Sequence, residues 1–451
     1  MTEQMMQDIA GKTIPAGYKQ TEVGVIPEDW GVSSLKDVAF FGGGTTPSRS
    51  QYDLFYKDGH HLWVKTLDLN NGPIFETDEY VTDAALTNTS LRKHKAGSVL
   101  VAMYGGFNQI GRTGLLRTDA AINQALLAII PDGSKLYSGF LLSQLNYHVD
   151  YWKLVASSSR KDPNITSTDI KNYELPLPSV KEQTAIANVL SDSDALIDAL
   201  EQLIAKKQAI KSATMQQLLT GRTRLPAFAL RPDGTKKGYK PSELGEIPED
   251  WEAASLGSLL KETPRYGINA PAVPLTGDTP VYIRITDISD DGYFNPGEKV
   301  GVNSPFSGMY FLSAGDIVLA RTGASVGKSY LYNKNDGQLV YAGFLIKVSP
   351  NQERLSSMFL SQYLKSHRYW NWVVVNSMRS GQPGINGSEY ASLLIPTPTI
   401  EEQTAIATIL SDMDNELQVL TQKLEKARAL KQGMMQQLLT GKIRLPLAAG
   451  A

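Results

Sequence analysis

The sequence predicts an α+β protein in which two similar globular domains are joined by two long, antiparallel, coiled-coil-like helices with pseudo-two-fold symmetry. Two internal repeats are the main evidence. Residues 17–30 (GYKQTEVGVIPEDW) return as 238–251 (GYKPSELGEIPEDW), and a longer block at 173–226 returns at 393–446. The period of about 220 residues is far too long for a solenoid unit. The chain therefore carries a duplication of a whole domain together with its connector.

The connectors are predicted to be helices of about 38 residues, roughly 57 Å long. Ser179 followed by Glu182, and Thr399 followed by Glu402, form capping boxes at which these helices begin. Each helix is expected to stop at a glycine, Gly221 or Gly441.

Each predicted helix carries an apolar seam with a spacing of three and four residues. In the second copy the seam contains Ile406, Leu410, Met413, Leu417, Leu420, Leu424 and Ala427. In the first copy it contains Ile186, Leu190, Ile197, Leu200 and Ile204, with interruptions at Ser193 and Lys207. Such seams are typical of helix packing, and two matching seams in one chain predict that the helices pack on each other.

The order of the repeats predicts where the chain ends lie. The chain runs from a short block through a first domain and helix, and then repeats this order. A pseudo-symmetric body would place the N-terminal block beside the end of the second helix, as in a cut circle.

The two globular domains, head one (31–172) and head two (252–392), differ more than the connectors but still align. Residues 63–69 correspond to 282–288, and both stretches alternate in the manner of half-buried strands. Residues 96–102 correspond to 314–320, again strand-like, and each enters a polar loop with glycines, 103–112 or 321–328. Residues 140–145 and 359–364 are each predicted to form a short helix.

The heads share a pattern but differ in the polar side chains on their loops. Arginine, lysine, asparagine and glutamine are the residues that reach base edges and phosphates. The candidate DNA contacts in head one are Lys65, Arg112, Arg160, Lys161 and Asn164. Those in head two are Arg284, Arg321, Lys328, Arg379 and Gln382. For any single residue, a solvated surface charge is the alternative. The aromatic pairs Tyr151-Trp152 and Tyr369-Trp370 are expected to be core or helix anchors.

Motifs for catalysis are not found. Residues 323–329 (GASVGKS) place three residues between the first glycine and Gly-Lys, whereas a phosphate-binding P-loop needs four, and a strand is expected to follow. His60 and His61 are adjacent, so on a strand they are expected to point to opposite faces and not to share a metal. The chain has no cysteine, which excludes thiolate metal sites and cysteine nucleophiles. We expect neither a catalytic site nor a metal site.

The overall composition is that of an ordinary globular protein, with 42% hydrophobic and 20% charged residues. No run approaches about 18 apolar residues, which excludes a transmembrane helix, and we expect no membrane partner. The N-terminus lacks a signal-peptide pattern, so a cytoplasmic location is expected. The formal net charge of −2 does not by itself indicate nucleic-acid binding. A DNA-binding chain of this charge would need local basic residues or partner subunits that contact the phosphates.

Several motifs resemble the specificity subunits of type I restriction-modification enzymes. They are the Gly24-x-Ile26-Pro27-x-x-Trp30 block, the Pro-x-Pro entry, the Glu182-Gln183-x-x-Ile186-Ala187 helix start and the Gln216-Gln217-Leu218-Leu219-Thr220-Gly221 helix end. The likeness covers nearly the whole chain, and its most specific parts are the connectors.

The resemblance implies a domain plan: an N-terminal half-repeat (1–30), target recognition domain 1 (31–172), a central region with a long helix (173–237), a repeat block with target recognition domain 2 (238–392), and a C-terminal region with a long helix (393–451). Each target recognition domain would read one half of a bipartite, asymmetric site in double-stranded DNA, and the helices would set the spacer.

The resemblance also implies partners in a bacterial or archaeal cytoplasm. Two adenine methyltransferase subunits would dock on the helices, and two restriction/translocase subunits would join them. S-adenosylmethionine, ATP and Mg²⁺ would be used by these partners, and this chain would hold no cofactor and catalyse no reaction. The main rival interpretation is a structural coiled-coil scaffold with two protein-binding heads. A second rival, an orphan methyltransferase or nuclease, would need catalytic motifs that we do not find.

Overall fold

The computed structural model describes residues 14–106, 108–157, 164–379 and 381–446. The chain divides into two compact units, Met1–Leu200 with Lys423–Ala451, and Glu201–Gln422. The first unit contains head one and the second contains head two. Throughout the described ranges, every helix is too short or too polar to cross a membrane.

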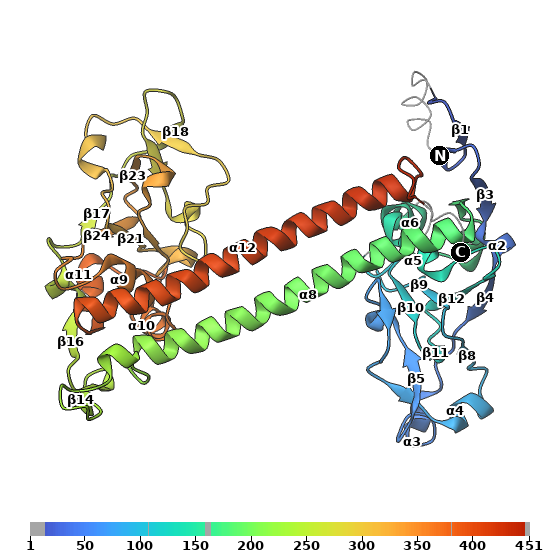
Figure 1. Cartoon of the computed structure of the whole chain (residues 1–451), viewed down its shortest axis with the longest axis horizontal. Helices are drawn as coiled ribbons and strands as arrows, with labels where there is room; N and C mark the ends of the chain where they lie inside the picture. Colours follow the sequence, from blue (N-terminus) through green and yellow to red (C-terminus); the bar gives the residue numbers. More distant parts are fainter. Residues whose placement is uncertain (1–13, 107, 158–163, 380, 447–451) are drawn as a thin grey trace. The chain divides into compact units, whose positions relative to one another are not determined.

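The first unit contains a five-stranded sheet in the order β4-β12-β9-β10-β6, a four-stranded sheet in the order β7-β5-β11-β8, and the strand pairs β1-β2 and β3-β13 (Figure 1). Its strands are β1 (Tyr18–Thr21), β2 (Gly24–Pro27), β3 (Gly31–Ser34), β4 (Ala39–Gly43), β5 (His61–Val64), β6 (Pro73–Ile74), β7 (Tyr80–Val81), β8 (Lys93–His94), β9 (Val99–Ala102), β10 (Thr113–Leu116), β11 (Ala120–Ile122), β12 (Leu126–Pro131) and β13 (Glu174–Leu177). Its helices are α2 (Leu35–Val38), η1 (Arg49–Gln51), α3 (Tyr52–Phe55), η2 (Thr66–Asp68), α4 (Asp83–Asn88), α5 (Ser138–Tyr147), α6 (Val149–Ser157) and α7 (Ser167–Lys171).

The second unit contains two four-stranded sheets, β17-β24-β21-β22 and β18-β20-β19-β23, and the pairs β14-β15 and β16-β25. Its strands are β14 (Tyr239–Ser242), β15 (Gly245–Pro248), β16 (Glu252–Ser255), β17 (Arg265–Tyr266), β18 (Ala272–Pro274), β19 (Val281–Ile283), β20 (Val300–Val302), β21 (Ile317–Ala320), β22 (Ser329–Leu331), β23 (Leu339–Tyr341), β24 (Leu345–Val348) and β25 (Leu394–Thr397). Its helices are η3 (Pro226–Phe228), η4 (Leu256–Leu259), η5 (Ile285–Asp287), η6 (Ser307–Tyr310), η7 (Gly323–Ser325), η8 (Lys334–Asp336), α9 (Ser357–Tyr363), α10 (His367–Ser377) and α11 (Gly387–Ser392).

The two heads share the central strand pairings of both sheets and differ at the sheet edges. Strand β9 pairs antiparallel with β10 and β12, and β21 pairs in the same way with β22 and β24. In the other sheet of each head, β5 pairs parallel with β11 and β19 pairs parallel with β23. Every residue of β9 and of β21 is buried, as expected for a strand covered on both faces. The predicted common fold of the heads, including the short helices at 140–145 and 359–364, is therefore confirmed.

The strands predicted at 63–69 and 282–288 are shorter than expected. They end at Val64 and Ile283, and a 3-10 turn follows each one. The cause is an aspartate at the same place in both heads: Asp68 accepts a hydrogen bond from the backbone N–H of Lys65 (2.6 Å), and Asp287 accepts one from that of Arg284 (2.8 Å). Such a local side-chain bond favours a turn over a continued strand.

The two connectors are single uninterrupted helices, α8 (Val180–Leu219, 40 residues) and α12 (Ile400–Leu438, 39 residues) (Figure 1). The predicted stops are confirmed, since Gly221 and Gly441 have φ angles of +71° and +70° after the helix ends. The seam residues predicted in both helices are buried or half-buried. Lys207, which interrupts the seam of α8, is paired with Glu416 of α12 (2.7 Å) in the second unit. In the first unit, Lys431 of α12 is paired with Asp194 of α8.

Only half of each predicted capping box forms. Ser179 accepts a hydrogen bond from the backbone N–H of Glu182 (3.3 Å), and Thr399 accepts one from that of Glu402 (3.4 Å). The two glutamate carboxylates do not cap the helices in return, because both bind a tryptophan and an arginine.

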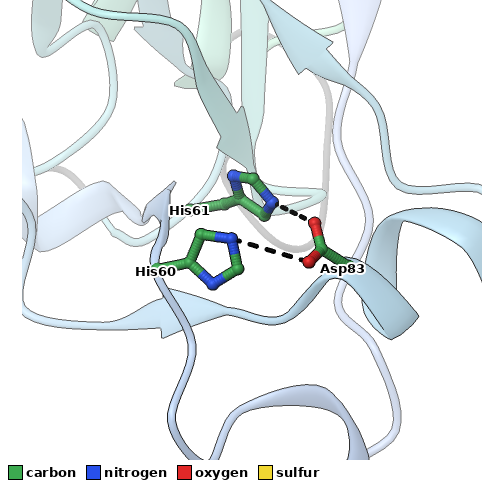
Figure 2. Close-up of side chains that lie close together, drawn as sticks. All are labelled: His60, His61 and Asp83. Atoms are coloured by element: carbon green, nitrogen blue, oxygen red, sulfur yellow. Dashed lines mark hydrogen bonds and ion pairs between the residues drawn. The ribbon is translucent and has the colours of Figure 1, made fainter.

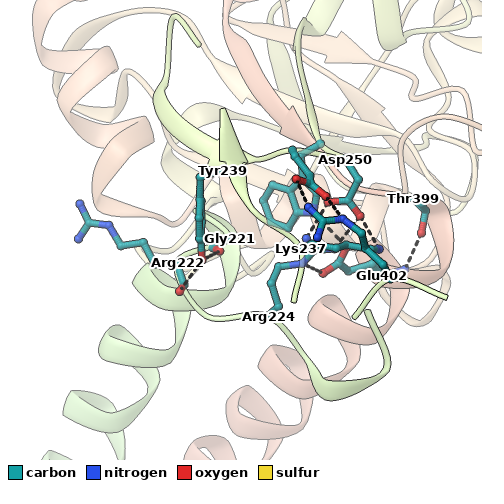
Figure 3. A network of polar contacts seen from close by, with 11 residues as sticks. Gly221, Arg222, Arg224, Lys237, Tyr239, Asp250, Thr399 and Glu402 are labelled. Atoms are coloured by element: carbon teal, nitrogen blue, oxygen red, sulfur yellow. Dashed lines mark hydrogen bonds and ion pairs between the residues drawn. The ribbon is translucent and has the colours of Figure 1, made fainter. Parts of the chain in front are cut away.

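In the second unit this carboxylate belongs to a polar network at the start of α12 (Figure 3). Glu402 accepts hydrogen bonds from Trp251 Nε1 (3.0 Å) and from Arg224 Nε (2.7 Å) and Nη2 (2.8 Å). Arg224 also binds both oxygens of Asp250, which Lys237 contacts at 2.7 Å. The Tyr239 hydroxyl donates to the Gly221 carbonyl (3.1 Å) at the end of α8. We call this network, centred on Arg224 and Glu402, the second joint.

The first unit contains the same arrangement, the first joint, built from the two ends of the chain. Arg444 binds Glu182 and both oxygens of Asp29, Trp30 donates to Glu182 (3.2 Å), and the Tyr18 hydroxyl donates to the Gly441 carbonyl (3.0 Å). The N-terminal block therefore lies beside the end of α12, which is the arrangement that the order of the repeats predicted.

Candidate nucleic-acid interface

The glycine-bearing loops that follow β9 and β21 have the same backbone geometry. Ala102 donates to the Arg112 carbonyl (2.9 Å) and accepts from the Gly111 N–H (3.0 Å). Ala320 donates to the Lys328 carbonyl (2.8 Å) and accepts from the Gly327 N–H (3.0 Å). The structure therefore places Arg112 and Lys328 at equivalent positions, as the alignment of the two heads predicted.

The glycines before these two residues are required by close packing. Gly111 and Gly327 have φ angles of +78° and +89°. A Cβ atom at Gly111 would lie 2.9 Å from Trp152, and one at Gly327 would lie 2.8 Å from Val373. Trp152 and Tyr369 are fully buried, as expected for core anchors, whereas the ring of Tyr151 is partly exposed.

A second loop joins the first in each head. Ile165 donates to the Met103 carbonyl (3.0 Å), and Ile385 donates to the Arg321 carbonyl (2.9 Å). Asn164, half-buried, directly precedes Ile165. Arg160 and Lys161, the other candidates in this loop of head one, lie outside the described residues.

Head two brings three of the candidate side chains to these paired loops. The guanidinium of Arg321 lies over the ring of Tyr266, 4.9 Å from its centroid, and its Nε has no hydrogen-bond acceptor among the described residues. A Cβ atom at Gly323 would lie 2.9 Å from Nε2 of Gln382, so the Gln382 amide rests on this glycine. Arg379 is held by Glu389 at 2.5 Å.

The other candidate cations differ in how firmly they are held. Lys328 pairs with the exposed Asp290 (2.7 Å), whereas the half-buried Arg112 makes no side-chain hydrogen bond to another described residue. Arg284 binds Asp287 through Nε (2.9 Å) and Nη2 (2.8 Å), and this aspartate is buried. Arg284 therefore stabilises its own turn, in addition to any contact it makes with a ligand.

Lys65 belongs to a cluster that the sequence did not indicate. Its ammonium lies 3.4 Å from Glu79, which also binds Arg49 at 2.6 Å. The Arg49 guanidinium lies over the Tyr56 ring, 4.2 Å from its centroid. A hydrogen bond from Arg49 lowers the pKa of Glu79, so this carboxylate is charged at neutral pH and orients both cations. The only sequence signal for Arg49 was its place in a polar loop after Pro47, and no signal marked Tyr266.

The prediction that His60 and His61 point to opposite faces is wrong. Both rings face Asp83, and their centroids are 4.1 Å apart (Figure 2). Strict alternation does not apply, because strand β5 begins only at His61 and His60 lies in the preceding turn.

The family model and the relatives described below all point to one family. The family described as type I restriction modification DNA specificity domain matches residues 27–211 and 248–429, so this chain belongs to that family. It is 26% identical over 436 residues to the putative type I restriction enzyme MjaX specificity subunit of Methanocaldococcus jannaschii, covering 95% of this chain and 97% of the relative. It is 24% identical over 446 residues to the MjaVIII specificity subunit of the same organism, covering 93% and 94%.

A solved structure shares the fold. The crystal structure of the type I restriction-modification system S subunit from M. genitalium matches with a TM-score of 0.59 at 15% identity, over 95% of this chain and 98% of that chain. The duplicated heads and the two long connectors are therefore features of a known architecture.

Proposed function

We propose that this chain is the DNA sequence-specificity subunit of a type I restriction-modification complex, and that it is not itself a catalyst. The observation that carries the proposal is the pair of matched loops. Both heads build them on the same backbone, but with different side chains: head two has the half-buried Arg321 where head one has the buried Met103, and Lys328 where head one has Arg112. One scaffold with two different surfaces suits two readers of two different half-sites.

The two long helices suit the other roles in this proposal, which are to set the spacer between half-sites and to dock partner subunits. At 1.5 Å per residue α8 and α12 are each about 60 Å long, more than the roughly 34 Å of one DNA turn. We propose that they pack as an antiparallel coiled coil with pseudo-two-fold symmetry, set the spacer between half-sites and dock two adenine methyltransferase subunits. Two restriction/translocase subunits complete the complex, and the partners use S-adenosylmethionine, ATP and Mg²⁺.

The near-neutral charge of the chain fits a complex in which this chain reads the sequence and its partner subunits bind the DNA backbone. Binding to DNA without sequence preference depends on many phosphate contacts. With a formal net charge of −2, this chain would read base edges while its partners supply most phosphate contacts.

The test is an exchange of head one. Residues 31–172 are replaced by the equivalent head of a relative, and methylated adenines are mapped in DNA from cells that express the complete enzyme. We expect one half of the recognition site to change while the other half and the spacer stay. A change in both halves would contradict independent heads.

A binding measurement separates this function from that of a protein-binding scaffold. The chain is purified with its methyltransferase partner, and filter binding compares the methylated sequence with random duplex. A preference for the mapped sequence is expected. Equal retention of both duplexes would favour the scaffold.

A further inference from the structure

Three residues with metal-ligating side chains meet at the edge of the four-stranded sheet in head one (Figure 2). One nitrogen from each of His60 and His61 and one oxygen of Asp83 all lie within 4.8 Å of one another. His61 Nε2 is 2.7 Å from Asp83 Oδ1, and His60 Nε2 is 3.6 Å from Asp83 Oδ2. We propose that these three residues bind a divalent transition metal ion of the Zn²⁺ type.

The backbone, rather than the ligands themselves, brings the three residues together. Strands β5 and β7 pair antiparallel with His61 opposite Val81, and the N–H of His60 donates to the Val81 carbonyl (3.2 Å). Asp83 follows two residues later, at the first position of α4. A Cβ atom at Gly59 would lie 2.8 Å from the backbone of Val81, so glycine permits the close approach that places His60. The site is thus fixed by sheet register before any ion binds.

The ligand set suits zinc and its neighbours. Zn²⁺ binds imidazole nitrogen at about 2.0–2.1 Å and carboxylate oxygen at about 2.0–2.2 Å, usually with four ligands. A tetrahedral ion with such bonds separates its ligand atoms by about 3.3 Å. His61 Nε2 lies 2.7 Å from Asp83 Oδ1 and His60 Nε2 lies 3.6 Å from Asp83 Oδ2, so each histidine is close to this separation from one of the two carboxylate oxygens. The side chains of His60 and Asp83 are 62% and 77% exposed, so both can adjust and the remaining position is open to water.

Lys93 distinguishes a metal site from a metal-free hydrogen-bonded cluster. Its Nζ lies 3.3 Å from Nδ1 of His61. An ammonium group can only donate a hydrogen bond, so in this arrangement Nδ1 of His61 accepts from Lys93 and the Nε2–H of His61 donates a hydrogen bond to Asp83. An ion at Nε2 must displace that proton, and the ammonium charge opposes the ion. Removing the charge of Lys93 should therefore strengthen metal binding, although it removes a contact of the metal-free cluster.

The experiment uses the tag-free full chain, titrated with Zn²⁺ by isothermal calorimetry and with Co²⁺ by visible absorption. We expect one site of this kind, with Co²⁺ bands that report histidine and carboxylate ligands. His60→Ala and Asp83→Asn should each weaken binding about tenfold or more. Lys93→Gln should tighten it.

The matched control is His367→Ala, which removes an exposed histidine in head two and should leave binding unchanged. Circular dichroism of each variant checks that the fold is intact, and the exposure of His60 and Asp83 makes these substitutions mild. Absence of binding to the unmodified chain would overturn the proposal. So would binding that survives both His60→Ala and Asp83→Asn. Neither readout requires DNA, so a failed metal test leaves the proposed DNA function standing.

Discussion

The guanidinium of Arg224 holds the buried carboxylate of Glu402 through two hydrogen bonds of 2.7 and 2.8 Å. Arg444 holds Glu182 through the same two nitrogens in the other unit. The second joint lies within a continuous stretch of chain, whereas the first connects segments from opposite ends of the sequence. The same arginine–glutamate pairing therefore forms in both units, in one between neighbouring repeats of the chain and in the other between segments far apart in the sequence.

The second joint is predicted to be the more sensitive to mutation. The side chains of Arg224 and Glu402 are 7% and 2% exposed, whereas that of Arg444 is 39% exposed. Arg224→Met leaves a buried carboxylate without its cation, which costs about 3–5 kcal/mol. Arg444→Met leaves a carboxylate that is also buried, since Glu182 is 3% exposed, but it should cost less because water can replace the more exposed Arg444 side chain. Urea unfolding followed by circular dichroism gives the total effect, and hydrogen exchange of residues 238–256 locates it.

Two variants serve as controls for that prediction. Arg224→Met combined with Glu402→Gln removes both charges and should recover part of the lost stability. Arg231→Ala breaks a surface pair with Glu249, in which the two side chains are 41% and 34% exposed, and should change the stability little because water screens the pair. Equal losses for Arg224→Met and Arg231→Ala would contradict the importance of burial.

Acid should destabilise the second joint through Asp250. Burial alone would raise the pKa of this carboxyl, but hydrogen bonds from Arg224 and Lys237 outweigh it and lower the pKa from 3.8 to about 2. Because the folded pKa is the lower one, the stabilisation is complete above pH 4 and is lost as the pH falls toward 2.

The measurement is urea unfolding of the chain and of Asp250→Asn at several pH values between 5 and 2. The unmodified chain should lose stability more steeply over this interval than the variant. Asp29→Asn, at the more exposed equivalent position in the first joint, should flatten the curve less. Parallel curves for the chain and Asp250→Asn would show that Asp250 does not contribute.

Substitution of the glycines after the long helices is predicted to lower the stability of the fold. Gly221 has a φ of +71°, and a Cβ atom there would lie 2.4 Å from Pro248. Gly221→Ala should therefore destabilise the second unit by about 1–3 kcal/mol, through strain and overlap together.

Gly433 provides the matched control for this prediction, because it lies inside α12 and a Cβ atom added there would meet nothing within 4 Å. Gly433→Ala should stabilise the chain by about 0.5–1 kcal/mol, since alanine is the better helix former. Thermal unfolding of both variants gives the comparison, and a stabilising Gly221→Ala would refute the packing argument.

Arg321 is predicted to read DNA in head two. Its guanidinium lies over Tyr266, which orients it; its Nε is buried without an acceptor among the described residues, so any contact with a base would come from the two terminal nitrogens. Arg321→Ala in the methyltransferase complex should weaken specific binding by about 1–3 kcal/mol and relax one position of one half-site. Competition binding against single-base variants measures both effects.

Lys334→Ala, an exposed lysine on η8, is the control and should leave base preference unchanged. If Arg321→Ala weakens binding to all sequences equally, then Arg321 contacts phosphate rather than a base.

Prediction from sequence succeeded best where a pattern is repeated. The duplication predicted two heads of one fold, and the helix stops at Gly221 and Gly441 followed from local backbone chemistry. Prediction failed where a side chain has a distant partner. Glu182 was assigned to a capping box because Ser179 precedes it by three residues, but its carboxylate binds Arg444, 262 residues away.

In the candidate nucleic-acid interface, too, some features were predicted from the sequence and others depend on distant residues. The equivalence of Arg112 and Lys328 followed from aligned glycine loops. The ring beneath Arg321 belongs to Tyr266. The carboxylate shared by Arg49 and Lys65 belongs to Glu79. Spacing along the chain did not predict the position of Tyr266 or of Glu79.

The duplicated plan, the long helices and the family resemblance can be read from the amino-acid order, because repeats, helix caps and apolar periodicity are local properties of a chain. The contacts between distant groups needed the folded structure: the joints that bind Glu182 and Glu402, the loops around Arg321, and the His60, His61 and Asp83 cluster. Those contacts depend on sheet register and on side-chain direction, which residues far apart in the sequence determine together.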